Sequence, residues 1–175
     1  MFAQTPSADA GPARSGGLSQ PTQQFLCFVL GDDLYAVRID MVREILEVAH
    51  MTPLPLMPDF VRGVMNLRGV VVPVIDLSAR LGLATTTIGR RTCVIIVDVA
   101  LPDESGMQTL GVLVDAVQEV LDVTPQDQEP VPRLGTAIDP AHLRGMVRVH
   151  GRATPELDLT AILDPARLVE LISQH

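Results

Sequence analysis

The sequence predicts a mainly β fold, built from two small β-barrels within one chain of 175 residues. Three observations lead to this prediction: a segment that occurs twice, short apolar strands separated by turn signals, and an aliphatic interior. Hydrophobic residues make up 47% of the chain, yet the aromatic ones are only four Phe and one Tyr. The core must therefore be built largely from Val, Leu and Ile, and the β-branched residues among these favour strands.

The repeated segment covers residues 62–81 and 144–163, which lie 82 positions apart and are identical at eight of twenty positions. Both copies open with Arg-Gly and carry a Pro-x-x-Asp-Leu motif. Upstream, residues 35–48 and 110–123 also match, at an offset of 75. A repeat of this kind indicates one supersecondary unit used twice, and a loop of different length in the two copies accounts for the change of offset.

The chain is expected to form one domain after a tail. Residues 1–22 are rich in Ala, Gln, Ser, Pro and Gly and predict a disordered tail without the features of a signal peptide. Residues 23–170 form the domain, with the first barrel at about 23–90 and the second at about 91–170. Apolar runs such as residues 70–75 are too short to cross a bilayer, so we expect a soluble, cytoplasmic protein.

Alternation and turn residues predict the elements in order. The first half should begin with a hairpin of strands 25–30 and 34–39, followed within 40–49 by a short helix capped by Asp40, with a continuing strand as the alternative. An extended segment should cover 53–58. A second hairpin, of strands 64–67 and 70–77, and a helical turn at 78–81 should complete this half. The second half should contain a hairpin of strands 92–99 and 107–114 across the loop 101–106, an acidic, Pro-rich connection 115–141, a hairpin within 144–159 and a C-terminal helix 164–171. Pro73 predicts that its strand lies at a sheet edge or a bulge.

Composition excludes several function classes. The formal net charge is −8, and all 13 basic residues are Arg. An acidic chain without a basic run does not suit nucleic-acid binding, which needs clustered cations.

Cys27 and Cys93 sit in apolar runs and are interpreted as buried thiols, although a disulfide between them stays open at this level.

Residues typical of catalysis or metal binding do not form a pattern. The four His lie outside zinc-ligand spacing, and no phosphate-binding loop or nucleophile elbow is present in the sequence. Asp76 and Asp158 each follow a strand and precede a helical turn, which favours a role as helix N-caps. We therefore expect no enzyme activity, no cofactor and no metal. Arg68 differs, because at a hairpin tip its planar fork of donors could meet a partner's carboxylate.

Two stretches carry a resemblance to a known family. Residues 25–48 and 58–82, above all Asn66-Leu67-Arg68-Gly69 followed by Pro73-x-x-Asp76-Leu77, resemble CheW-type chemotaxis coupling proteins, over about residues 23–170. The resemblance implies two five-stranded SH3-like barrels in a non-catalytic adaptor. It implies that the partners are the signalling tip of methyl-accepting chemoreceptors and the regulatory domain of a CheA-type histidine kinase, within membrane-associated receptor arrays.

The resemblance also implies a receptor-binding surface made by Arg68, Asn66, Val42 and Glu44, with Gly63 and Gly69 as structural turns beside it. It leaves the kinase-binding residues unassigned. Two departures from the family pattern are Glu156, which suggests that the last strand is an exposed edge, and the longer loop 101–106.

Three alternatives remain from the sequence. The adaptor could serve a specialised pathway that controls type IV pili or a second messenger. An SH3-like nucleic-acid module conflicts with the charge of −8. A small hydrolase would need His150 or the acid pairs at 32–33 and 103–104, but no nucleophile, base and oxyanion site accompany them.

Overall fold

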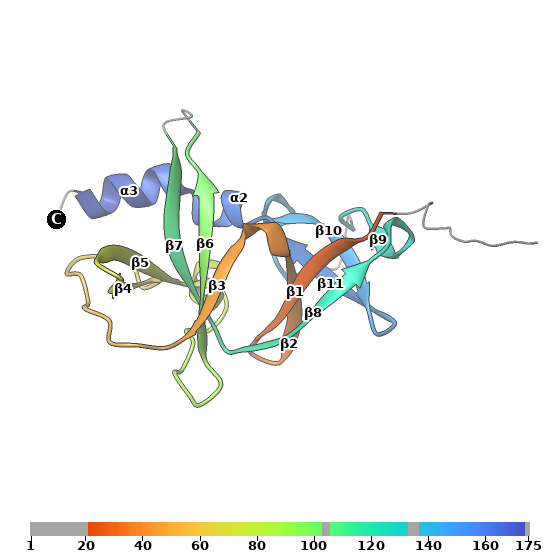
Figure 1. The fold of residues 1–175 in the computed structure, drawn as a ribbon, viewed down its shortest axis with the longest axis horizontal. Coiled ribbons are helices and arrows are strands. Elements are labelled where there is room, and N and C mark those ends of the chain that lie inside the picture. The colour runs from red at the N-terminus through yellow and green to blue at the C-terminus, as the bar shows by residue number, and fades with distance from the viewer. Residues whose placement is uncertain (1–20, 103–105, 133–136, 174–175) are drawn as a thin grey trace, which may run out of the picture.

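The computed structural model describes residues 21–102, 106–132 and 137–173, and this part of the chain forms two β-sheets with short helices beside them (Figure 1). The mainly β fold with a C-terminal helix is confirmed. Residues 1–20 of the expected tail and residues 103–105 of the loop 101–106 lie outside the described residues. Among the described helices, none is long and apolar enough to cross a membrane.

Strand pairing gives the two sheets related orders. One sheet has the order β8-β1-β2-β11-β10-β9, with β1 (Gln23–Leu30), β2 (Asp33–Arg38), β8 (Ala116–Val123), β9 (Gln128–Glu129), β10 (Leu143–Val149) and β11 (Arg152–Leu157). The other has the order β3-β6-β7-β5-β4, with β3 (Val42–Glu47), β4 (Val61–Leu67), β5 (Val70–Asp76), β6 (Cys93–Ala100) and β7 (Met107–Val114). Apart from the short β9, the two orders correspond strand by strand between the repeats: β8 matches β3, β1 matches β6, β2 matches β7, β11 matches β5 and β10 matches β4.

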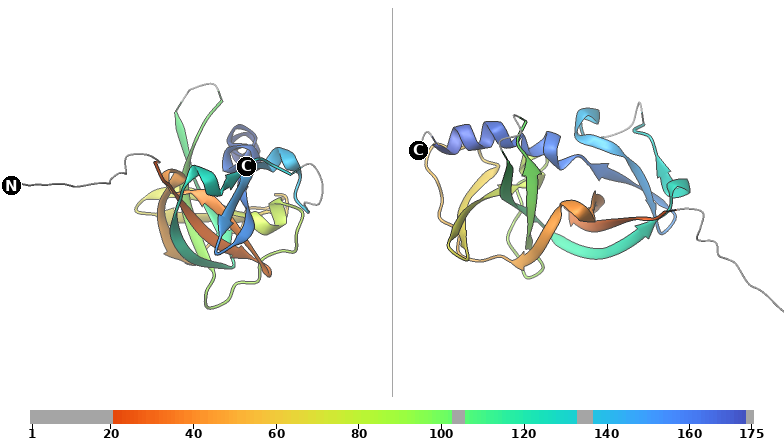
Figure 2. Two further views of the ribbon diagram at one scale, coloured as in Figure 1. Left: turned by 90° about the vertical axis from the view of Figure 1, so that its right-hand side faces the viewer. Right: turned by 45° about the horizontal axis from the view of Figure 1, so that its top comes forward.

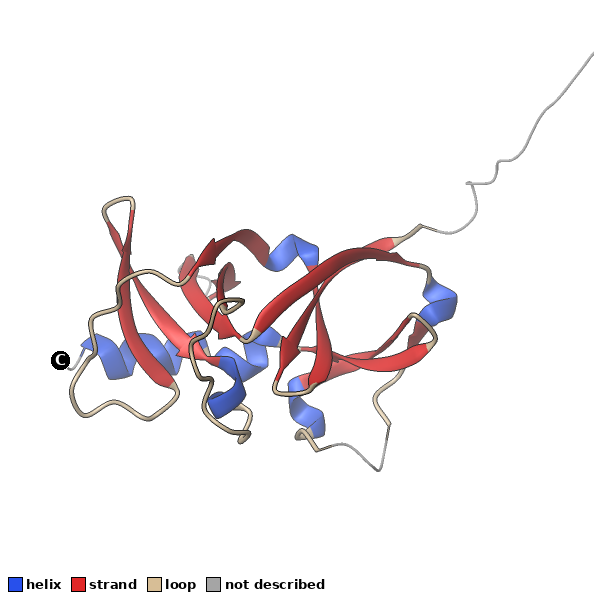
Figure 3. Ribbon diagram, turned by 90° about the horizontal axis from the view of Figure 1, so that it is seen from below, coloured by secondary structure: helices blue, strands red, loops and turns tan. Residues whose placement is uncertain are grey.

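The helices are short segments between and beside the sheets (Figure 3). They are the α-helices α1 (Leu77–Arg80), α2 (Leu159–Leu163) and α3 (Pro165–Ser173), and the 3₁₀ turns η3 (Ile39–Met41), η4 (Pro125–Asp127) and η5 (Pro140–His142). Asp76 and Asp158 are confirmed as N-caps, because each carboxylate accepts a hydrogen bond of 3.2 Å from the backbone N–H three residues later.

The two repeats exchange their first hairpins. Strands β1 and β2 pair with β8 and β11 of the second repeat, while β6 and β7 pair with β3 and β5 of the first (Figure 1). The parallel pairs β5–β7 and β2–β11 are counterparts and join the repeats. A barrel boundary near residue 90 is therefore wrong as a division of the sheets, since each sheet is assembled from both halves of the chain.

Two expected elements are wrong in type. The short helix expected within 40–49 is one 3₁₀ turn followed by strand β3, so the alternative of a continuing strand is confirmed there; β3 alternates half-buried and exposed residues and pairs with β6. The expected connection 115–141 contains β8, which pairs with β1 along most of its length. In both places the partner strand comes from the other repeat, so long-range pairing decides the local structure.

Two expected edge positions are also corrected. Strand β5 lies inside its sheet and not at an edge, but the β4–β5 pair does contain a β-bulge, the alternative expected for Pro73. Pro73 immediately precedes the residues that pair with β7, so its missing N–H breaks no bond of that ladder. Strand β11 is not an exposed edge, because it lies between β2 and β10. Glu156 is only 4% exposed and accepts from Arg38 at 3.0 Å, with Arg144 at 3.3 Å. Two guanidinium groups compensate the burial of this carboxylate.

The largest core cluster joins the sheets, with residues from β1, β2, β6, β7 and α2 packed together. Each sheet adds a smaller cluster of its own.

Cys27 is fully buried and Cys93 half-buried, and both thiols are free, which resolves the disulfide alternative. Burial, with a smaller contribution from the charge of Glu119, raises the pKa of the Cys27 thiol to about 11.

Candidate functional site

The tip of the β4–β5 hairpin is a tight turn whose backbone is set by the sequence. Arg68 and Gly69 both have positive φ, 51° and 88°, as a two-residue turn of type I′ requires. The Asn66 side-chain oxygen accepts a hydrogen bond of 2.9 Å from the Gly69 N–H, which fixes the turn. Asn66 thus shapes the backbone on which Arg68 is presented.

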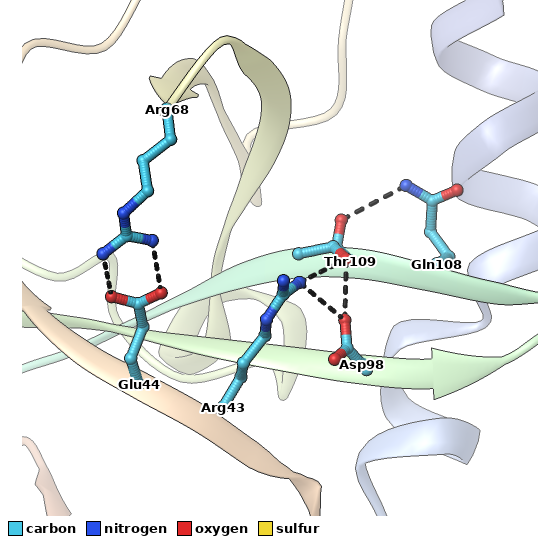
Figure 4. A network of polar contacts seen from close by, with 6 residues as sticks. All are labelled: Arg43, Glu44, Arg68, Asp98, Gln108 and Thr109. Carbon is cyan, nitrogen blue, oxygen red and sulfur yellow. Dashed lines mark hydrogen bonds and ion pairs between the residues drawn. The ribbon is translucent and has the colours of Figure 1, made fainter.

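Arg68 and Glu44, two residues assigned to one surface from the resemblance, are in direct contact. The guanidinium donates two hydrogen bonds to the Glu44 carboxylate, at 2.7 and 2.8 Å (Figure 4). Such a bidentate ion pair fixes the orientation of both side chains. The hydrogen bond from Arg68, followed by its charge and that of Arg43, holds the pKa of Glu44 below its ordinary value, and the same bond raises the pKa of Arg68. The tip arginine is therefore not a free donor.

The pair still presents a charged face to solvent. The Arg68 side chain is 68% exposed, whereas that of Glu44 is 24% exposed. Glu44 accepts along one edge of the guanidinium, and the group has further N–H donors. Arg68 can therefore meet a partner's carboxylate or carbonyl while Glu44 holds it in place.

A second polar network lies beside this pair and ties β3 to β6 and β7 (Figure 4). Arg43 lies 3.5 Å from Asp98 and donates to the Thr109 hydroxyl at 3.4 Å, and Thr109 donates to Asp98 at 2.6 Å. Gln108 donates to the Thr109 carbonyl at 3.2 Å. The network joins side chains from three neighbouring strands and fixes β3, the strand that carries Glu44.

Val42, the fourth assigned residue, is half-buried and packs against the main core cluster. Its direct contact area for a partner is small. The sequence assignment missed two exposed apolar residues directly after the turn, Val70 and Val71, which are 58% and 63% exposed. The valine run beginning at Val70 was the available signal. We refer to Glu44, Asn66, Arg68, Val70 and Val71 as the hairpin-tip surface.

Gly63 does not form a turn, contrary to the sequence assignment, but lies inside β4 at a β-bulge with φ 142°. Here the backbone of Thr52 lies antiparallel beside the strand and forms two hydrogen bonds with Val64, of 2.8 and 2.9 Å. A Cβ atom on Gly63 would overlap the Thr52 carbonyl oxygen. Gly145 repeats the arrangement, with a Cβ position 2.6 Å from the Glu129 carbonyl oxygen. The repeated Arg-Gly motif thus marks a close approach of a neighbouring backbone segment.

The second repeat carries a counterpart of the ion pair. His150, at the β10–β11 tip, lies 2.8 Å from the Glu119 carboxylate on β8. His150 and Glu119 match Arg68 and Glu44 in the repeat, and His150 also has positive φ, 49°. The His150 side chain is exposed. The second tip thus keeps the geometry but carries an imidazole in place of the guanidinium.

A cavity of about 600 Å³ opens in the other sheet and has a mostly apolar lining that includes Tyr35, Leu143, Met146, Val149 and His150. It shares no lining residue with the hairpin-tip surface. Throughout residues 21–102, 106–132 and 137–173, no group of three potential metal ligands gathers.

The fold thus consists of two sheets with exchanged hairpins, and a bidentate ion pair fixes the tip of the β4–β5 hairpin. The family model of the CheW-like domain matches residues 24–172, so the chain belongs to the CheW-like family. The resemblance inferred from the sequence is thereby confirmed, and the chain is a non-catalytic scaffold protein of the chemotaxis type.

Individual relatives agree with the family match. The chain is 33% identical over 145 residues to the chemotaxis protein CheW of Rhizobium meliloti, covering 83% of this chain and 90% of that one. It is 34% identical over 151 residues to protein FrzA of Myxococcus xanthus, covering 85% and 90%. The crystal structure of the scaffolding protein TtCheW from Thermoanaerobacter tengcongensis is similar with a TM-score of 0.70 and 31% identity, covering 79% and 90%.

Proposed function

We propose that this chain couples the cytoplasmic tips of chemoreceptors to a CheA-type histidine kinase within a chemosensory array. The observation that carries the proposal is the CheW-like family match over residues 24–172. An adaptor of this kind holds receptor and kinase regulatory domain at once, and each weak contact is strengthened because the partners are held close together in the array. Membrane association then comes through the receptors and needs no insertion of this chain.

For the receptor we propose the hairpin-tip surface as the contact. Arg68 supplies exposed N–H donors, and Val70 and Val71 supply apolar area. Glu44 orients Arg68, and Asn66 shapes the turn. Val42 acts indirectly by packing β3 onto the core, and Gly63 and Gly69 hold the hairpin backbone.

A direct test measures the affinity of the protein for a soluble chemoreceptor signalling fragment by calorimetry. Arg68→Glu should weaken binding about tenfold, a change of about 1.4 kcal/mol in binding free energy, because it removes the donor fork and brings two carboxylates together. Arg90→Glu is the matched control, since Arg90 is exposed and lies outside the hairpin-tip surface. Equal loss in both variants, or no loss in a folded Arg68→Glu protein, would reject this surface.

A second candidate is the same coupling role in a pathway other than swimming control. The 34% identity to protein FrzA of Myxococcus xanthus favours this candidate. Autophosphorylation of each CheA-type kinase of the source organism, measured with and without this protein, separates the candidates. The kinase that responds identifies the pathway, whether it controls flagella, type IV pili or a second messenger.

A further inference from the structure

A pocket of about 270 Å³ lies between the C-terminal helix α3, the end of α1 and the segment before β4. Helix α3 extends over the end of the molecule that carries β4 and β5 (Figures 1 and 2). The lining is Pro58, Phe60, Arg80, Leu163, Asp164, Arg167, Leu168 and Leu171. None of these residues belongs to the hairpin-tip surface.

The walls of this α1–α3 pocket are apolar. Leu163 and Leu168 are buried, with 1% and 2% exposure, and Phe60 and Leu171 are half-buried. The volume lies below the range of about 300–1,000 Å³ that is usual for sites enclosing a whole small-molecule ligand. A pocket of this size and lining suits apolar side chains projecting from a peptide.

Two cations flank the apolar walls and come from different elements. Arg80 ends α1 and Arg167 lies in α3. Six other arginines form carboxylate pairs, but within the described ranges neither Arg80 nor Arg167 has a carboxylate oxygen within 4.0 Å. Asp164 is the single acidic residue of the lining, so the pocket has a formal charge of +1 in a chain of −8.

The Arg80 guanidinium is held in place from one side. Its carbon lies 5.3 Å from the centre of the Phe60 ring. This cation–π contact restrains the Arg80 side chain, and the guanidinium carries five N–H donors with which it can bind an acceptor. Because Phe60 already restricts the side chain, less conformational entropy is lost when Arg80 binds a carboxylate.

We propose that the α1–α3 pocket docks a short acidic and apolar peptide segment of a partner protein. A carboxylate of the segment binds Arg80 and Arg167, and a neighbouring apolar side chain enters between Phe60 and Leu168. A single carboxylate suits this site better than a nucleic acid or an anionic membrane, because Asp164 and the net charge of −8 oppose a polyanion. The site is distinct from the hairpin-tip surface and does not depend on the proposed coupling function.

The test is selection of binders from a displayed library of random 12-residue peptides against the full chain. The Arg80→Gln/Arg167→Gln double variant serves for counter-selection, and Arg90→Gln is the control because Arg90 is exposed and outside the pocket. Selected peptides should place Asp or Glu next to Leu, Ile, Met or Phe. Each synthesised binder should bind the double variant with about tenfold lower affinity and Arg90→Gln with unchanged affinity. Replacing the acidic residue of the peptide with its amide should lower the affinity for the wild-type protein about fivefold or more.

Three results would overturn the proposal. The first is that no peptide is retained by the wild-type protein more than by the double variant. The second is that the selected peptides lack acidic residues or bind after amide replacement without loss. The third is that phosphatidylserine vesicles, and not peptides, bind in a manner that depends on Arg80 and Arg167. Thermal unfolding of both variants checks that they are folded, as expected for changes at the protein surface.

Discussion

Arg68 and Glu44 are bound to each other by hydrogen bonds of 2.7 and 2.8 Å, and this pair ties the tip of the β4–β5 hairpin to β3. In the strand order, β3 and β4 are the two ends of the same sheet. The pair of His150 and Glu119 joins the β10–β11 tip to β8 in the same way. The residue proposed to meet the receptor is therefore also part of a repeated contact that connects the ends of a curved sheet.

Charge reversal at this pair separates the two roles of Arg68. Arg68→Glu should weaken receptor-fragment binding, and the double variant Arg68→Glu/Glu44→Arg should restore the ion pair with its charges exchanged. If Arg68 contacts the receptor itself, binding stays weak in the double variant, as measured by calorimetry. Recovery of wild-type affinity would instead show that only the intact ion pair matters.

The lowered pKa of Glu44 predicts an acid-dependent part of the stability. The unfolded chain takes up a proton at Glu44 near pH 4.5, its ordinary value, whereas the folded chain does so only at lower pH. This contribution is fully present above pH 4.5 and is lost as the pH falls through the lowered value. Denaturant titrations from pH 6 to pH 3 should show a smaller decline for Glu44→Gln than for the wild type; parallel declines would contradict this pairing.

Gly63→Ala should destabilise the fold by about 1–3 kcal/mol, because the added Cβ meets the Thr52 carbonyl oxygen at a position that also requires φ 142°. Gly145→Ala should act in the same sense through the Glu129 carbonyl oxygen. Gly89→Ala is the matched control, since its nearest contact is a side-chain atom at 3.9 Å. Chemical denaturation measures the stability of all three variants, and an unchanged stability of Gly63→Ala would contradict the close backbone approach at Gly63.

The exchanged hairpins predict how the two halves of the chain behave when separated. A fragment of residues 1–90 contains β1–β5, and one of residues 91–175 contains β6–β11, so each holds part of both sheets. Neither should show a cooperative thermal transition as a monomer, and an equimolar mixture should regain one in circular dichroism. Independent folding of either monomeric fragment would mean that its own hairpins can complete a sheet.

The local elements were largely predictable from the sequence, because turn residues and alternation act within a few positions. The hairpin turn at Gly69 and the caps at Asp76 and Asp158 depend on neighbouring residues alone. The repeat likewise indicated two equivalent units. It could not indicate the exchange, since two repeats with matching strands offer the same pairing surfaces within and between units.

The burial of charged side chains, and the residues with which they form ion pairs, were not predictable from local sequence patterns. Glu156 looked like an exposed edge residue, but Arg38 lies 118 positions away and binds it in the interior. The sequence placed Arg68, Asn66 and Glu44 on one surface through the family resemblance, yet it did not indicate that Arg68 and Glu44 bind each other. Such contacts depend on the three-dimensional arrangement of distant strands, which no local pattern encodes.

The central claim, that the chain couples receptor to kinase, is tested most directly by kinase autophosphorylation. The rate of the cognate CheA-type kinase should be measured with receptor signalling fragments, with and without this protein, and with Arg68→Glu in its place. We expect a large rise in the autophosphorylation rate that needs all three wild-type components and is reduced by Arg68→Glu. An unchanged rate with folded protein and functional receptor fragments would contradict it.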